Sequence, residues 1–235
     1  MKKTILVLVL LAISLIPIIS LAKGYDTYPE RAIAYMEIEF RCGCSRVGTG
    51  AMICRDGLIT AGHNLICDTH SMTAEKIDFY FGCADVDEGD YFKKYGGHFH
   101  YWYWDSFKNG YSSKNDVGYV LFDEDVGDST GWFATYYGSD NALQGKSYVV
   151  EGYVEGGGLT DCSSWLDIRN SMEFNLGVDS LPYGMEGAPI YIYRGDKPTL
   201  VGVYHSHNSY ECHGRRLTKK LFDEMTTRLT FDSIY

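Results

Sequence analysis

Basic residues are scarce in this chain. Its 235 residues include 21 Lys and Arg against 31 Asp and Glu, a formal net charge of −10. This balance argues against nucleic acid or an anionic membrane surface as a partner, because both are negatively charged. The chain also lacks internal repeats and low-complexity segments. We therefore expect one globular unit, with room for two subdomains and an ample core.

Residues 1–22 are expected to be a secretory signal peptide and not part of that unit. Two lysines precede an apolar run over 4–19 and a small-residue end at 20–22. The alternative is an uncleaved membrane anchor, because the run is nearly long enough to span; Pro17 and the cleavage-like end favour removal. Removal takes away two lysines and no acid, so the net charge of −10 becomes −12. We expect residues 23–235 to be secreted, extracellular or periplasmic, without membrane contact.

The remaining composition favours strands and turns over helices, with 20 tyrosines, four tryptophans and 26 glycines. One helix is expected near the C-terminus, where Leu221, Met225 and Leu229 recur at fourfold spacing with Leu217 just before them. The expected strands are 47–53, 58–60, 77–81, 99–104, 117–122, 148–153, 172–176, 188–193 and 200–204.

Three segments together have the pattern of a catalytic triad. Thr60-Ala61-Gly62-His63 places an imidazole just after an apolar strand, and Asp116 directly precedes another. The third segment, residues 183–189, is a tight glycine turn with Glu186 at its tip, followed by a strand. The order His, Asp, nucleophile is the order found in chymotrypsin. Each segment alone is a weak signal, and the ordered set is a specific one.

The nucleophile of such a site is missing. A serine hydroxyl attacks an acyl carbon when an imidazole takes its proton, a carboxylate orients the imidazole, and backbone N–H groups stabilise the oxyanion. His63, Asp116 and the N–H groups of Gly184 and Glu186 supply all parts except the hydroxyl. Glu186 stands where serine is expected, and carboxylate attack on a peptide would give an anhydride. We expect its side chain to point toward His63 and to fill the oxyanion site.

The chain resembles the secreted glutamyl endopeptidase family of trypsin-like serine peptidases over about residues 28 to 228. The matching blocks are 28–35, 48–53, 58–63, 116–121, 130–133, 152–153, 201–203 and 216–222.

This resemblance implies an all-β fold of two packed antiparallel six-stranded β-barrels, chymotrypsin-like, with a C-terminal α-helix. The first barrel would cover about 28–125, the second about 132–215, and the helix about 217–229. No cofactor is expected. The family holds an acidic substrate side chain with a histidine of the specificity pocket, and the matching position here is Tyr204 or His205.

Seven cysteines follow the signal segment, and in an exported protein we expect disulfides and no metal site. Cys42-Gly43-Cys44 lacks a second pair at zinc-like spacing. The family resemblance implies a bridge from Cys67 beside His63, with Cys42 or Cys44 as the partner. The odd count leaves at least one thiol free or paired between chains. The cysteines are Cys42, Cys44, Cys54, Cys67, Cys83, Cys162 and Cys212.

Two further patterns have alternative interpretations. His98 and His100 alternate on an aromatic strand, which we interpret as a surface strand and not as a metal site. The acidic run 85–90 has carboxylates for calcium, but its spacing departs from that of an EF-hand loop, so we expect a solvated loop.

Two functions from different classes compete. The first is a monomeric, secreted, non-proteolytic homologue that binds a peptide or protein in the old cleft, and we favour it. The alternative is an active serine endopeptidase, cleaving after acidic residues, whose serine is altered in this sequence. Ser180 lies six residues before Glu186, across Pro182, and is a poor substitute nucleophile. A purely structural role is a third class without a feature of its own.

Overall fold

The computed structural model describes residues 25–104, 107, 110, 112–207 and 211–231. The expected signal peptide over 1–22 lies outside these residues. No helix in the described part of the chain has the length and apolar character that a membrane crossing requires.

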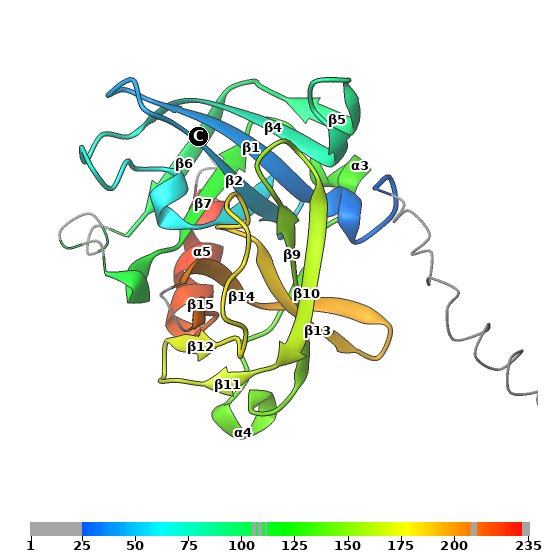
Figure 1. Ribbon diagram of the computed structural model, residues 1–235, viewed down its shortest axis with the longest axis vertical. Coiled ribbons are helices and arrows are strands. Elements are labelled where there is room, and N and C mark those ends of the chain that lie inside the picture. Colours follow the sequence, from blue (N-terminus) through cyan, green and yellow to red (C-terminus); the bar gives the residue numbers. More distant parts are fainter. Residues whose placement is uncertain (1–24, 105–106, 108–109, 111, 208–210, 232–235) are drawn as a thin grey trace, which may run out of the picture.

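Two curled antiparallel sheets stack on each other, the first above the second in Figure 1, with helix α5 against their side. Within the described residues the first sheet has seven strands. In order across it they are β5 (Asp90–Tyr95), β4 (Ala74–Asp85), β1 (Ile33–Phe40), β2 (Ser45–Met52), β3 (Gly57–Thr60), β7 (Gly118–Phe122) and β6 (Phe99–Tyr103).

The second sheet has eight strands in the same described residues. Its main path runs β10 (Leu159–Trp165), β9 (Ser147–Tyr153), β13 (Pro189–Arg194), β14 (Lys197–His207), β15 (Cys212–Arg216), β12 (Glu173–Asn175) and β11 (Asp167–Ile168), and β8 (Ala134–Thr135) pairs with β14 in parallel. Short helices lie between strands: η1 (Glu30–Ala32), η2 (Gly62–Asn64), η3 (Ser113–Asn115), α3 (Gly127–Thr130) and α4 (Asp140–Leu143).

The all-β fold of two packed barrels with a C-terminal helix is confirmed, but the expected count of six strands per barrel is wrong. In the first sheet the edge strand β5 adds to the count. It pairs with the second half of the twelve-residue β4, whose first half extends along β1. In the second sheet, the two-residue strands β8 and β11 add to the count. Such short pieces carry no periodic signal, so sequence patterns cannot find them.

The two sheets meet where β1 and β2 lie against β9. The ring of Tyr35 packs edge-on against that of Tyr153, with centroids 5.9 Å apart. The Tyr153 hydroxyl accepts a hydrogen bond of 2.8 Å from the backbone N–H of Cys83, and the Tyr153 N–H donates one of 2.9 Å to the Thr49 hydroxyl. These buried bonds fix β4 and β2 beside the second sheet, and β2 in turn supports the candidate site.

Helix α5 (Lys219–Phe231) begins two residues after the expected start at 217. Thr218 caps it, since its hydroxyl accepts a 3.3 Å hydrogen bond from the Leu221 N–H. Leu221 and Met225, on one helical face, are buried in the larger core cluster, which contains mostly first-sheet residues. Burial of each side chain contributes about 1.5–3 kcal/mol. The helix that follows the second sheet therefore helps to hold it against the first.

Candidate functional site

His63 and Asp116 lie side by side at the junction of the two sheets. His63 is in η2, directly after β3, and Asp116 follows η3 just before β7. The His63 backbone N–H donates to Asp116 Oδ1 at 2.9 Å, and His63 Nδ1 lies 2.7 Å from Asp116 Oδ2. Gly62 permits this approach, since a Cβ there would lie 3.1 Å from Asp116 Oδ1.

This contact orients the imidazole. Both side chains are largely buried, 12% exposed for His63 and 7% for Asp116. Burial raises the pKa of the Asp116 carboxyl, but the charge and hydrogen bonds of His63 outweigh it and hold that pKa below its usual value. An ionised carboxylate only accepts hydrogen bonds, so Nδ1 carries the hydrogen and Nε2 is left as the basic atom of the neutral ring. This is the tautomer that a general base of a triad requires.

The turn that carries Glu186 is anchored on both sides. Met185 and Ala188 are fully buried in the core of the second sheet. The Glu186 carbonyl accepts hydrogen bonds from the Thr49 N–H at 2.9 Å and from the Asn64 side-chain amide at 2.8 Å. Thr49 belongs to β2 and Asn64 to η2, the short helix that also carries His63. These two hydrogen bonds therefore hold the tip of the turn beside His63.

Two glycines with positive φ shape this turn. Gly184 has a φ of 99° and Gly187 a φ of 96°, which favours glycine at both positions. At Gly187 space adds a second requirement, because a Cβ there would collide with the Thr49 carbonyl oxygen.

The Glu186 carboxylate is bound by its own turn. Its Oε2 accepts a hydrogen bond of 2.9 Å from the Gly184 N–H. That N–H is one of the two expected oxyanion donors, so the protein's own anion occupies it. The Glu186 N–H has no hydrogen-bond acceptor within the described residues. Those residues also hold no ion pair between Glu186 and His63, which differs from the expected orientation of the carboxylate toward the imidazole. The reason is local, because a backbone N–H two residues away is within closer reach of the side chain.

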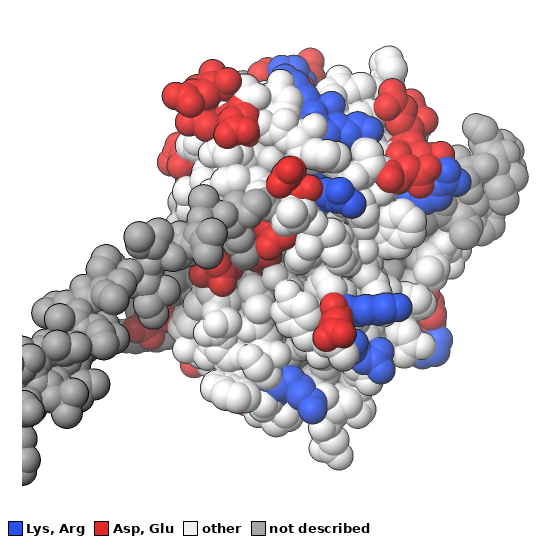
Figure 2. Space-filling model, turned by 90° about the vertical axis from the view of Figure 1, so that its right-hand side faces the viewer, with Lys and Arg blue, Asp and Glu red and all other residues white. Residues whose placement is uncertain are grey.

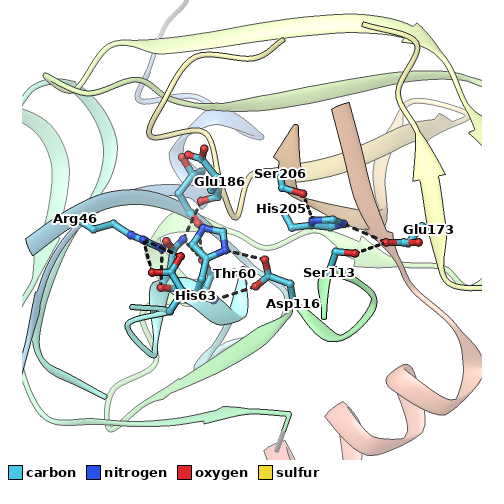
Figure 3. A network of polar contacts seen from close by, with 12 residues as sticks. Arg46, Thr60, His63, Ser113, Asp116, Glu173, Glu186, His205 and Ser206 are labelled. Carbon is cyan, nitrogen blue, oxygen red and sulfur yellow. Dashed lines mark hydrogen bonds and ion pairs between the residues drawn. The ribbon is translucent and has the colours of Figure 1, made fainter. Parts of the chain in front are cut away.

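His205 adjoins the pair from the second sheet, as Figure 3 shows. It is fully buried, with Nε2 4.0 Å from Glu173 Oε1 and Nδ1 2.7 Å from the Ser206 hydroxyl. Burial lowers the pKa of His205 to about 4, although the nearby Asp116 and Glu173 oppose this shift. The structure therefore keeps a neutral imidazole beside Asp116 at neutral pH.

Of the two residues expected in the specificity pocket, only His205 lines the cleft. Tyr204 is fully buried in the core of the second sheet. The two neighbouring side chains of β14 therefore differ in place, Tyr204 in the core and His205 at the cleft.

Glu173 and Ser113 are site residues that the sequence did not reveal. The Ser113 hydroxyl donates to Glu173 Oε1 at 2.9 Å, and the Asn170 amide donates to Oε2 at 2.8 Å. Burial raises the pKa of the Glu173 carboxyl, but these hydrogen bonds outweigh it, so the pKa lies below its usual value. No motif surrounds Glu173, since its role comes from pairing of β12 beside β15.

A cleft of about 310 Å³ opens beside the His63–Asp116 pair. Besides His63, Asp116, Glu186 and His205 it is lined by Arg46, Asp68, Phe107, Ser113, Tyr183 and Ser206. Arg46 donates to the His63 carbonyl at 3.0 Å and lies 3.4 Å from Asp68 Oδ1. The cleft thus offers cationic, anionic and aromatic contacts next to the imidazole.

No disulfide joins any of the seven cysteines, all of which are among the described residues. Cys42, Cys44 and Cys67 lie together without the expected bridge, and a fourth potential metal ligand, His70, lies with them. Within the same described residues, His98, His100 and the 85–90 loop take part in no such cluster. His100 is instead exposed, 3.9 Å from Asp123, and Asp85 accepts a hydrogen bond from the Glu88 N–H.

Comparison with known proteins shows the fold and no more. Neither a scan of protein-family models nor a search of curated protein sequences gives a match. Among solved structures, a Glu endopeptidase is 16% identical with a TM-score of 0.75, covering 89% of this chain and 94% of its own. Protease Anisep from Arthrobacter nicotinovorans is 16% identical with a TM-score of 0.70, covering 85% and 96%.

A scabies mite inactivated protease paralogue also shares the architecture, at 14% identity and a TM-score of 0.62, covering 88% of this chain and 97% of its own. All three solved structures share the chymotrypsin-like fold of trypsin-like serine proteases with this chain.

Proposed function

We propose that this chain is a secreted, non-proteolytic homologue of the glutamyl endopeptidase type that binds a peptide or protein segment in the cleft beside His63. The observation that carries the proposal is the hydrogen bond from the Gly184 N–H to the Glu186 carboxylate. It joins the position expected to hold the nucleophile to the position expected to stabilise the oxyanion.

Glu186 would remove two catalytic functions at once. Glu186 offers no hydroxyl, and loss of the nucleophile costs about 10⁶ in turnover in comparable triads. A substrate carbonyl also needs the Gly184 N–H, which already donates to Glu186. Loss of one oxyanion donor costs about 10²–10³ in turnover. A negative charge at this position also repels the developing oxyanion.

The cleft keeps features suited to a peptide. Tyr183 is 50% exposed at its rim and offers an aromatic surface, while Arg46 and Ser206 offer hydrogen-bond donors. Figure 2 shows basic and acidic side chains interspersed over one face of the described molecule, with no broad basic area on it. Together with the acidic net charge, this supports a protein or peptide over a nucleic acid as the ligand.

The experiment combines activity and binding on protein purified from the culture medium. We expect no fluorophosphonate labelling, no cleavage of Glu- or Asp-containing peptides, and enrichment of specific sequences from a displayed peptide library. Tyr183→Ala should weaken binding of an enriched peptide, whereas Tyr193→Ala should not, since Tyr193 is equally exposed but does not line the cleft. N-terminal sequencing should begin near residue 23. Efficient cleavage that His63→Ala abolishes would show instead that the chain is a working endopeptidase.

A further inference from the structure

Four potential metal ligands come together on two turns next to the candidate site. Cys42 and Cys44 lie in the turn between β1 and β2, and Cys67 and His70 lie between η2 and β4. One ligand atom from each of the four residues lies within 4.8 Å of all the others. His70 Nδ1 is 3.4 Å from the Cys44 sulfur and 3.6 Å from the Cys67 sulfur.

The two nitrogen–sulfur distances are close to those of a tetrahedral zinc site. Zn–S distances of about 2.3 Å and Zn–N distances of about 2.0 Å imply ligand-to-ligand distances of about 3.5 to 3.8 Å in a tetrahedron. Three sulfurs and one imidazole form a known ligand set of closed structural zinc sites, and soft thiolates select zinc over magnesium or calcium. We propose that Cys42, Cys44, Cys67 and His70 bind one zinc ion.

Both turns are held by backbone hydrogen bonds that do not depend on a metal. In the first turn the Gly43 N–H donates to the Phe40 carbonyl at 2.8 Å, and the Phe40 N–H donates to the Cys44 carbonyl at 2.9 Å. Gly43 has a φ of 81°, a region that suits glycine. In the second turn the Cys67 N–H donates to the Met72 carbonyl and the Ser71 N–H to the Cys67 carbonyl, both at 2.8 Å. The backbone therefore presents all four side chains before a ligand arrives.

A disulfide accounts for this cluster less completely than zinc does. One bridge would use two of the three sulfurs and give no role to the third or to His70. Zinc uses all four groups and releases the thiol protons to solvent as it binds. Zinc also neutralises the charge of the thiolates. The nearby cation Arg46, two residues after Cys44, is already ion-paired to Asp68.

The zinc ion would fasten the β1–β2 turn to the segment that follows His63. Arg46, two residues beyond Cys44, donates to the His63 carbonyl at 3.0 Å. Cys67 lies four residues after His63. The metal would thereby stabilise the wall of the cleft without touching Asp116 or Glu186, and it does so whether or not the chain is proteolytic.

The test begins with metal content of the full-length protein, purified without chelator or reductant. We expect about one zinc per chain by elemental analysis and native mass spectrometry, and its release by a thiol-modifying mercurial. Replacement by Co²⁺ should give thiolate-to-cobalt charge transfer and the intense visible bands of a tetrahedral site. An intact mass that is lower by two hydrogens, with a mapped disulfide among Cys42, Cys44 and Cys67 and no zinc, would overturn the proposal.

Matched variants separate ligands from bystanders. His70→Gln should lower zinc affinity by more than the roughly 10- to 100-fold that loss of an outer-shell partner costs. His70 is exposed, so this variant should fold. Cys44→Ser should also lose zinc, while Cys162→Ser, in the second sheet and outside the cluster, should keep it. Unchanged zinc affinity in His70→Gln would contradict the site, because His70 is proposed as one of its four ligands.

Discussion

The backbone N–H of Gly184 and the carboxylate of Glu186 are joined by a 2.9 Å hydrogen bond within one turn. In a working triad such an N–H binds the carbonyl oxygen of the substrate, and the side chain two residues later attacks the carbonyl carbon. Here the two groups satisfy each other. His63 Nδ1 and Asp116 Oδ2 lie 2.7 Å apart, but residue 186 offers this pair a carboxylate and not a hydroxyl.

Glu186→Ser should convert this site into one that reacts. The change removes the anion, releases the Gly184 N–H and supplies a hydroxyl beside His63. We expect fluorophosphonate labelling to appear in Glu186→Ser, measured by in-gel fluorescence. Glu186→Ala releases the same N–H without a hydroxyl and should stay unlabelled, as should Glu186→Ser combined with His63→Ala. An unlabelled but fully folded Glu186→Ser would mean that His63 is not positioned to act as a base.

His205 should make the protein less stable as the pH falls from about 6.5 to 4. Its pKa is about 4 in the folded chain, against about 6.5 when unfolded, so the unfolded state binds more protons between these values. The difference corresponds to about 3 kcal/mol of unfolding free energy, lost progressively through that window. Urea unfolding at pH 7 and pH 4.5 should show this loss in the wild type and a smaller one in His205→Gln. An equal pH dependence in both proteins would show that His205 is solvated.

Asp116 should contribute a second loss of stability at lower pH. Its folded pKa is depressed, so its stabilising contribution is complete above the unfolded value of about 3.9 and fades as the pH falls through the folded value. In Asp116→Asn the drop in urea midpoint below pH 4 should be smaller than in the wild type. Asp196→Asn, at an exposed turn, is the control and should leave the drop nearly unchanged. A wild-type slope in Asp116→Asn would remove Asp116 as the source.

Gly187→Ala should be far more damaging than an alanine at another glycine of positive φ. At Gly187 a Cβ meets the Thr49 carbonyl and the Asn64 amide, and the backbone has a φ of 96°. We expect a loss of about 3 kcal/mol or more, in the range of strong steric defects. Gly195 has a φ of 65° but no atom within 4 Å, so Gly195→Ala should cost only about 1–2 kcal/mol. Thermal unfolding compares them, and equal losses would show that the turn relaxes around the new methyl group.

Local signals in the sequence were sufficient for much of the fold. Apolar stretches flanked by turn residues predicted β3, β7, β9 and β13, and fourfold spacing predicted helix α5. Six strands of the described residues were not predicted: β1, β5, β10 and β15, and the two-residue β8 and β11. Strand β1 is central and buried on both faces, so it lacks alternation, and β5 is an edge added by the length of β4.

The sequence by itself indicated three residues of the candidate site. His63, Asp116 and Glu186 sit in recognisable blocks because a strand end or a glycine turn must present each of them. Only the tertiary structure decided what these groups contact. The Glu186 carboxylate meets the Gly184 N–H and not the imidazole, His205 is buried beside Asp116, and His70 joins three cysteines. Side-chain torsions and contacts between distant turns set these relationships, and neither leaves a periodic trace along the chain.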